Sequence, residues 1–403
     1  MNDADRPARR VIVLGSTGSI GVSALDVVAS LDAATTPGPR FEVVGLAAGT
    51  RGGDLEAQAA RFGVEEVAVA TPQAAEAVSS NRRCRVGMDA ATTLVREIAR
   101  PGDLVVAAMV GAAGIPAVLA AIAAGCDIAL ANKETLVAAG AIVMPAAKAA
   151  GVEILPVDSE HAALHQCLRS GRGTEEIGRL VLTASGGPFR TWDANRMRQA
   201  TVAEALDHPT WAMGRKVTID SASMMNKGLE LIEAHWLFGV GPDRLDAIVH
   251  PQSIVHSFVE FLDGSTLAQL SPPDMRMPIQ YAMCHPERVP GCAPSLDWAG
   301  LRDLVFEPVD HDRFPALGLA LDAIRRGGTA GTILNAANEA AVEAFLAERI
   351  PFGRIPELVG EALEAVEIRP VTSLAEVDAA DAESRAWVHR TLDSGPIPNP
   401  AGG

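Results

Sequence analysis

Two carboxylates separated by one residue stand where an apolar run gives way to a predicted helix. Asp158 and Glu160 follow the run 152–157, with Ser159 between them. Oxygen ligands at this spacing can hold one divalent cation, and carboxylates suit Mg²⁺ or Mn²⁺ better than zinc. The same residues fit a helix N-cap followed by an acidic first turn, which requires no metal. The pattern alone leaves both interpretations open.

Residues 207–238 hold the densest group of polar side chains, in a segment that indicates a strand, a turn and a helix. Asn226, Lys227 and Glu230 are three or four residues apart, so they can share one helical face. An amide and an ammonium beside a metal-binding carboxylate suit a phosphorylated polyol. Spacing does not choose between Glu230 and Glu233 as the metal ligand, and a solvent-exposed charged helix is the alternative. The other candidates in the segment are His208, Trp211, Lys216 and Ser221.

A histidine pair on the helix after Asp158 has the spacing of a zinc site. His161 and His165 are four residues apart, but Ala162 occupies the position of the glutamate base in an HExxH motif. We therefore interpret His165 as structural.

Three glycines near the start of the chain indicate a nucleotide site. Gly15, Gly18 and Gly21 directly follow the apolar residues 11–14 and open a predicted helix. Glycines there let the backbone turn tightly and approach a phosphate that rests on the helix N-terminus. An ordinary strand–helix turn has similar glycines, and the spacing is GxxGxxG instead of GxGxxG. Its place at the first strand–helix junction favours dinucleotide binding.

The end of the second predicted strand favours NADP over NAD. An NAD site places an acid there to bind the ribose 2′-hydroxyl, but this chain has Gly49, Thr50 and Arg51. A guanidinium without a nearby carboxylate suits a 2′-phosphate. The alternative is that Arg51 is a solvated loop cation.

These candidates require elements that bring them together. Strand-like runs alternate with helix-like stretches over the first 157 residues, which predicts a parallel sheet covered on both faces. From residue 179 longer strand-like segments appear, at 179–187, 216–220 and 245–270, and three amphipathic helices are predicted near the end of the chain. We predict an α/β fold with four parts: a Rossmann-like NADP-binding domain at 1–157, a central α+β catalytic domain at 158–293, a linker at 294–313 and a C-terminal helical bundle at 314–403.

Composition narrows the classes of partner. The 403 residues are 48% hydrophobic and carry a net charge of −16, so the chain can fill more than one core and lacks the basic surface that nucleic acids or anionic membranes require. Residues 104–126 carry no charge, but their glycines and Pro116 favour a strand, a loop and a helix over a membrane span. Five scattered cysteines and the absence of a secretory pattern predict reduced thiols in the cytoplasm.

Several stretches together resemble the 1-deoxy-D-xylulose 5-phosphate reductoisomerase family. The acid–amide stretches are far more specific than the glycine turn, and the matches follow one another along nearly the whole chain. They are LGSTGSIG (14–21), ALANKETLV (129–137), VDSEHAA (157–163), LTASGGPFR (182–190), HPTWAMGRK (208–216), IDSASMMNKGLELIEAHWLF (219–238), HPQSIVHSFVEFLDGS (250–265), PDMRMPIQYA (273–282) and LNAANEAAVEAFL (334–346).

The resemblance implies roles for individual residues. The metal ligands it implies are Asp158, Glu160 and Glu230. The substrate contacts it implies are Lys133, Ser159, Glu160, Ser185, His208, Ser221, Asn226, Lys227 and Glu230, and we add Trp211 as a lid over the sugar. The cofactor contacts it implies are Thr17, Gly18, Ser19, Ile20, Gly49, Asn132, Glu134 and Gly214. We include Thr50 and Arg51, although the family often shows a basic residue and then Asn after this glycine.

The resemblance also implies an activity. It predicts an NADPH-dependent and Mg²⁺- or Mn²⁺-dependent homodimer that rearranges and reduces 1-deoxy-D-xylulose 5-phosphate, a phosphorylated ketose, to 2-C-methyl-D-erythritol 4-phosphate in non-mevalonate isoprenoid synthesis. Lys133 and the three acids would act in catalysis. The alternatives are a metal-free NADP dehydrogenase of the homoserine or semialdehyde type, and a dinucleotide-sensing module without catalysis. The first alternative predicts activity that survives treatment with a chelator. The second predicts NADPH binding without turnover.

Overall fold

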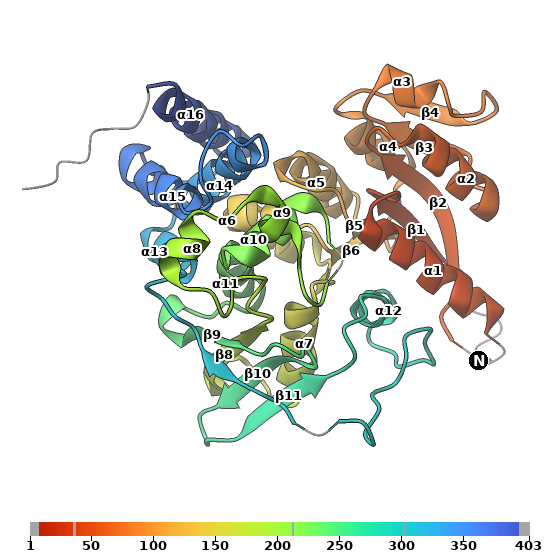
Figure 1. Ribbon diagram of the computed structural model, residues 1–403. Coiled ribbons are helices and arrows are strands. Elements are labelled where there is room, and N and C mark those ends of the chain that lie inside the picture. The colour runs from red at the N-terminus through yellow and green to blue at the C-terminus, as the bar shows by residue number, and fades with distance from the viewer. Residues whose placement is uncertain (1–7, 35–37, 212, 302, 395–403) are drawn as a thin grey trace, which may run out of the picture. The chain divides into compact units, whose positions relative to one another are not determined.

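The chain forms two compact units built from alternating segments. The computed structural model describes residues 8–34, 38–211, 213–301 and 303–394 (Figure 1). Unit 1 comprises residues 1–136, 143–183 and 252–304. Unit 2 comprises residues 137–142, 184–251 and 305–403.

Unit 1 contains a seven-stranded sheet in the order β4-β3-β2-β1-β5-β6-β7. Every neighbouring pair is parallel, as the alternation of strands and helices predicts. The order reverses at β1, and ligands of open α/β sheets bind at the carboxyl ends of strands at such a point. The strands are β1 (Arg9–Leu14), β2 (Phe41–Ala48), β3 (Glu66–Val69), β4 (Arg83–Val86), β5 (Leu104–Ala107), β6 (Asp127–Leu130) and β7 (Ile154–Pro156).

Helices cover both faces of this sheet because successive strand residues point to opposite sides. Val11 and Val13 join a core with α1 (Ser19–Ala33), α2 (Gly52–Phe62) and α12 (Arg276–Cys284). On the other face Ile12 lies near Ile98 of α4. The remaining helices of this sheet are α3 (Pro72–Ala75), α4 (Ala90–Ile98), η2 (Ala112–Gly114), α5 (Ile115–Ala123) and α6 (Glu134–Ala150). The predicted α/β fold class is thus confirmed.

The uncharged stretch 104–126 folds as a strand, a short loop and a helix, as predicted. It contains β5, η2 and α5, and Pro116 lies in the first turn of α5. Among the described residues, no helix combines the length and apolar character that a membrane span requires.

Antiparallel strands follow the parallel sheet in sequence. In unit 1, β10 (Val255–Phe261) pairs with both β8 (Ile177–Ala184) and β11 (Thr266–Leu270). The helix α7 (Ser159–Leu168) packs against β10 and β11. In unit 2, β9 (Leu245–Val249) pairs with β12 (Glu307–Pro308). The 3₁₀ helices η3 (Thr174–Glu176) and η4 (Pro242–Arg244) precede β8 and β9.

One predicted strand is wrong. Residues 216–220 lie in the helix α10 (Arg215–Ala222), so this part of the chain is helix, turn and helix instead of strand, turn and helix. The turn is at Met224, whose φ of 61° starts α11 (Met225–Phe238). The β-branched residues Val217, Thr218 and Ile219 favour a strand, but packing against other helices outweighs that preference.

Unit 2 is mainly helical. The long helix α14 packs against α10, α13, α15 and α16, and α13 also packs against α11 (Figure 1). The three helices predicted near the end of the chain correspond to α13 (Ala316–Arg326), α14 (Ala330–Leu346) and α15 (Arg354–Ala365). A fourth helix, α16 (Leu374–Asp393), was not predicted. Two short helices, α8 (Ala194–Arg198) and α9 (Val202–Leu206), lie between β8 and α10 in sequence.

Candidate active site

The glycine turn after β1 has the geometry of a phosphate-binding loop. Gly15 has a φ of 80°, which favours glycine, and Gly18 is the N-cap of α1. A Cβ atom at Gly21 would lie 2.4 Å from the Gly15 carbonyl oxygen, so only glycine fits at this close approach. The predicted residues Thr17, Gly18, Ser19 and Ile20 therefore surround the N-terminus of α1, at the point where the strand order reverses.

Arg51 lies beside this turn. Its Nη2 donates a hydrogen bond to the carbonyl oxygen of Thr17, and its side chain forms a 3.7 Å ion pair with Asp54. The side chain of Arg51 is more than half exposed, and Gly49 and Thr50 are exposed as well. Because its guanidinium is next to the glycine turn, Arg51 is well placed for a cofactor phosphate.

Asn132 holds the backbone around the predicted nicotinamide side. Its Nδ2 donates to the carbonyl oxygens of Met109 and of Gly111, the latter at 2.9 Å. Its Oδ1 accepts from the backbone N–H and the hydroxyl of Thr135, at 2.9 and 2.6 Å. Asn132 thus connects the loops after β5 and β6, while Glu134 is buried in the first turn of α6.

The carboxylates Asp158 and Glu160 start helix α7. Asp158 is the N-cap, and its Oδ1 accepts from the backbone N–H of Ser159 at 3.0 Å. The Ser159 hydroxyl donates to Glu160 Oε2 at 2.6 Å, and Lys133 Nζ lies 2.5 Å from Asp158 Oδ2. One oxygen of Asp158 and one of Glu160 lie within 4.8 Å of each other. The cap and the cation site are thus compatible, because this oxygen pair fits a divalent cation.

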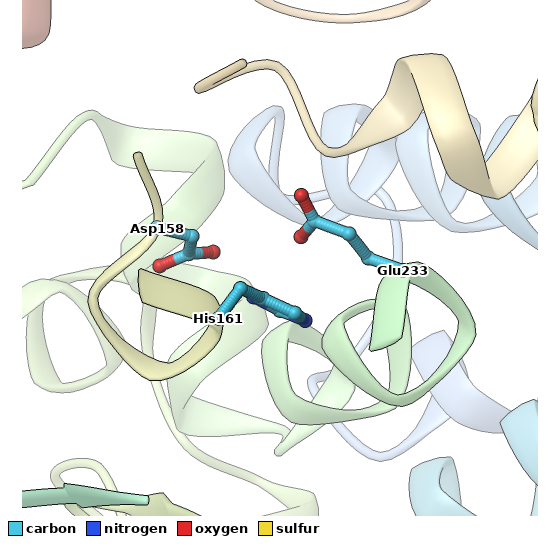
Figure 2. Close-up of side chains that lie close together, drawn as sticks. All are labelled: Asp158, His161 and Glu233. Atoms are coloured by element: carbon cyan, nitrogen blue, oxygen red, sulfur yellow. The ribbon is translucent and has the colours of Figure 1, made fainter. Parts of the chain in front are cut away.

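The two histidines of α7 have different surroundings. Figure 2 shows Asp158 and the buried His161 in the first turn of the helix. His165 lies one turn further along, with Nδ1 2.6 Å from the hydroxyl of Tyr281 on α12. Burial, together with the charges of His285 and Arg169, lowers the pKa of His165 to about 4. Its neutral ring fixes α7 to α12, which agrees with the structural role predicted for it.

Ser185, His208 and Ser221 form a second group, in unit 2. His208 Nε2 lies 3.1 Å from each of the two serine hydroxyls. The backbone N–H groups of Thr210 and Trp211 donate to His208 Nδ1, at 3.1 and 2.9 Å. Burial lowers the pKa of His208, so the neutral ring carries its proton on Nε2. Both serine hydroxyls thus lie beside the Nε2–H of His208, and N–H and O–H groups of this kind can bind an anion.

Glycines after β8 bring the two serines together. Gly186 and Gly187 both have positive φ angles, of 84° and 63°. A Cβ atom at Gly187 would lie 2.7 Å from the carbonyl oxygen of Ser221. The turn after Ser185 can approach α10 this closely only because these positions lack side chains.

A buried cluster lies on the first turns of α11. The Asn226 amide donates to Glu230 Oε1, and the Lys227 ammonium donates to Glu230 Oε2. Lys227 and Glu230 are only 3% and 1% exposed. The shared helical face predicted from their spacing is confirmed. Glu233 is also buried on α11 (Figure 2), so burial does not choose between the two acids, but Glu230 lies with the two candidate phosphate ligands.

The sequence did not identify two polar residues beside these groups. Gln58 of α2 donates from Nε2 to the carbonyl oxygen of Ser16 in the glycine turn, at 2.9 Å. Asp220, directly before Ser221, is 1% exposed and pairs with Lys216. The spacing of Lys216 and Asp220 would have indicated their pairing if the segment had been predicted as a helix.

Comparisons with known proteins match most of the chain. Models of the 1-deoxy-D-xylulose 5-phosphate reductoisomerase family match residues 11–140, and models of its C-terminal domains match residues 154–238 and 270–387. A 1-deoxy-D-xylulose 5-phosphate reductoisomerase from Mycobacterium avium is 53% identical over 359 residues, which cover 89% of this chain and 85% of that protein. The chain belongs to this family. A second relative of the same name, from Chloroherpeton thalassium, is 45% identical over 96% of this chain and 99% of that protein.

Solved structures of reductoisomerases share the fold. The enzyme from Zymomonas mobilis in complex with NADPH is 40% identical, with a TM-score of 0.85 over 96% of this chain and 99% of that one. A reductoisomerase in complex with NADPH, fosmidomycin and magnesium is 38% identical, with a TM-score of 0.88 over 96% of this chain and 98% of that one. The family and fold predicted from the sequence are confirmed, and a metal-free dehydrogenase of the homoserine type is disfavoured.

Proposed function

We propose that the chain converts 1-deoxy-D-xylulose 5-phosphate to 2-C-methyl-D-erythritol 4-phosphate with NADPH and a divalent cation. The observation that carries this proposal is the family match over nearly the whole chain. The predicted activity of an NADP-dependent oxidoreductase is supported by relatives that carry the name of this enzyme. The predicted ligands NADPH and magnesium are supported by a related structure that contains both.

NADPH would bind at the carboxyl ends of the strands in unit 1. The glycine turn offers the N-terminus of α1 to the pyrophosphate, through Thr17, Gly18, Ser19 and Ile20. Arg51, which contacts the same turn, would bind the 2′-phosphate with Gly49 and Thr50 nearby in sequence. Asn132, Glu134 and Gly214 remain our candidates for the nicotinamide side.

The cation would be held by Asp158, Glu160 and Glu230. The first two supply closely spaced oxygens at the start of α7, and the third supplies a buried carboxylate on α11. When bound, a divalent cation stabilises negative charge that develops on substrate oxygens. Lys133, which already lies against Asp158, would add positive charge to the same oxygens, and Ser159 would orient Glu160.

The substrate phosphate would bind to residues of unit 2. Ser185 and Ser221 both contact the Nε2–H of His208 and would offer their hydroxyls to the phosphate, and Asn226 and Lys227 would add an amide and an ammonium. A phosphate fixed far from the reacting carbons orients the ketose for both steps. Trp211, whose backbone N–H holds the His208 ring, would cover the sugar and exclude water.

Four further features are proposed from the sequence pattern and the resemblance together. They are Mn²⁺ as an alternative cation, assembly as a homodimer, a cytoplasmic location, and the division into domains at 1–157, 158–293 and 314–403 with a linker at 294–313.

The decisive experiment follows NADPH oxidation with 1-deoxy-D-xylulose 5-phosphate. We expect absorbance loss only when Mg²⁺ or Mn²⁺ is present, and none after chelation. Oxidation that survives chelation would support a metal-free dehydrogenase. NADPH binding without oxidation under any of these conditions would support a non-catalytic sensing module.

A further inference from the structure

A buried carboxylate in α10 is shared between two partners. Asp220 Oδ2 lies 2.8 Å from Lys216 Nζ, one turn earlier in the same helix. Asp220 Oδ1 accepts a hydrogen bond of 2.8 Å from Nδ2 of Asn338. A carboxylate that is 1% exposed depends on such partners, because its charge is costly to bury without them.

Asn338 comes from a distant part of the chain. It lies on α14, 118 residues after Asp220, in the stretch 334–346 that resembles the reductoisomerase family. Its side chain is fully buried where α14 packs against α10. Since a carboxylate only accepts hydrogen bonds, Asn338 must direct its NH₂ group toward Asp220.

The helix that Asn338 holds connects two parts of the proposed phosphate site. Gly214 caps its N-terminus directly after the segment that carries His208, and Thr218 donates to the Gly214 carbonyl oxygen at 3.1 Å. Ser221 lies in the last turn, 3.1 Å from His208 Nε2. A rotation of α10 would therefore move the Ser221 hydroxyl away from His208.

We propose that Asn338 is a positioning residue for the substrate phosphate, acting through Asp220 on α10. The proposal rests on the function proposed above, since it assigns the serine–histidine group to the phosphate. Asn338 fixes one oxygen of Asp220, and Lys216 fixes the other. The C-terminal helix α14 thereby sets the orientation of α10 and of Ser221.

The test compares two asparagines on the same helix. Asn335 is also fully buried, one turn before Asn338, but its Nδ2 donates to Glu339 at 3.1 Å instead of to Asp220. In Asn338→Ala we expect the KM for 1-deoxy-D-xylulose 5-phosphate to rise about 10-fold, since a hydrogen bond to a charged group is lost, while kcat stays within about 3-fold. Asn335→Ala should leave KM within about 2-fold. Equal KM values in the two variants would overturn the proposal.

Direct binding separates this proposal from the proposed reaction. Calorimetric titration with inorganic phosphate requires no turnover, so it reports on the site even if the ketose is not the substrate. We expect phosphate affinity to fall about 10-fold in Asn338→Ala and to be unchanged in Asn335→Ala. Phosphate binding that is unchanged in both variants would contradict the positioning role, whereas absent turnover in the wild type would contradict the proposed reaction.

A double-mutant cycle tests the route through Asp220. If Asn338 acts through that carboxylate, Asp220→Asn combined with Asn338→Ala should bind phosphate no more weakly than Asp220→Asn alone. Fully additive losses would show that Asn338 acts by another route. Asn338→Ser keeps a short donor and serves as the second variant if Asn338→Ala does not fold. Its phosphate affinity should lie below that of the wild type, and an affinity equal to that of the wild type and of Asn335→Ala would count against the proposal.

Discussion

The carboxylates proposed as cation ligands have very different surroundings in unit 1 and in unit 2. In unit 1 the side chains of Lys133 and Asp158 are 12% and 16% exposed, and Asp158 caps a helix whose N-terminus favours negative charge. In unit 2 the side chains of Lys227 and Glu230 are only 4% and 1% exposed, in the first two turns of α11. The first carboxylate is partly exposed and has the helix N-terminus and a lysine beside it, while the second depends on its side-chain partners.

This difference separates two roles that a site residue can have. Removing one partner of a buried pair leaves a charge without compensation, which affects folding as well as chemistry. Removing one partner of a partly exposed pair mainly affects chemistry. Similar substitutions in the two units should therefore give different ratios of lost activity to lost stability.

The largest effect is expected for Glu230→Gln. Loss of a cation ligand should lower kcat at least about 10³-fold, equivalent to about 4 kcal/mol, and weaken Mn²⁺ binding measured by calorimetry. Glu233→Gln is the matched control on the same helix and should retain Mn²⁺ binding. Near-normal activity of Glu230→Gln would refute the site of three carboxylates, and loss of Mn²⁺ binding only in Glu233→Gln would assign the ligand role to Glu233.

The next largest effect is expected for Lys227→Met, which leaves Glu230 buried without its ammonium. The free energy of unfolding, from urea denaturation without metal, should fall by about 3–5 kcal/mol. Added Mg²⁺ should recover part of the loss, because a bound cation replaces the missing charge. Lys148→Met, at an exposed position of α6, should change stability by less than about 0.5 kcal/mol. A stability loss as small as that of Lys148→Met would show that Lys227 does not stabilise the buried charge of Glu230.

A smaller, pH-dependent effect is expected for α7, the helix that carries the unit 1 carboxylates. The pKa of His165 is about 4 in the folded chain against an ordinary 6.5, so the unfolded chain binds the proton more tightly. The free energy of unfolding should therefore fall as pH decreases from about 6.5 to 4, by at most about 1.4 kcal/mol per pH unit. The pKa of His208 is also lowered, so His208 adds a pH dependence of the same sign. The contribution of His165 is therefore the difference between the free energies of unfolding of the wild type and of His165→Gln at each pH. Identical pH profiles of the two proteins would refute it.

The smallest stability effect is expected for Lys133→Met. The free energy of unfolding should fall by about 1 kcal/mol, although kcat should fall strongly. Urea denaturation and steady-state kinetics on the same preparation give both numbers. A stability loss as large as that of Lys227→Met would remove the distinction between the two units.

The sequence predicted those features that follow from local periodicity. The parallel sheet was predictable because short apolar strands alternate with helices, and the cluster on α11 was predictable because Asn226 and Lys227 lie four and three residues before Glu230. The glycine turn was predictable because it follows the first strand. These arguments use only neighbours in sequence.

Features that depend on distant contacts were missed. Residues 216–220 contain the β-branched Val217, Thr218 and Ile219 and were predicted as a strand, but the helix is favoured by the Lys216–Asp220 pair and by contact with α14. The strand β4 was not predicted, since RCRV is a short polar segment at the edge of the sheet. No local pattern connects Asp220 with Asn338, because 118 residues separate them.

The alternation of segments between the two units has a consequence for synthesis on the ribosome. The chain passes between the units five times, at residues 136, 142, 183, 251 and 304. The core of the parallel sheet includes Ile279, Ala282 and Met283 of α12. The core around the first strands is therefore incomplete until this helix, more than 200 residues later in the chain, has been synthesised. No single cut of the chain releases either unit intact. During synthesis, the unit that carries the glycine turn can be completed only after most of the protein has left the ribosome.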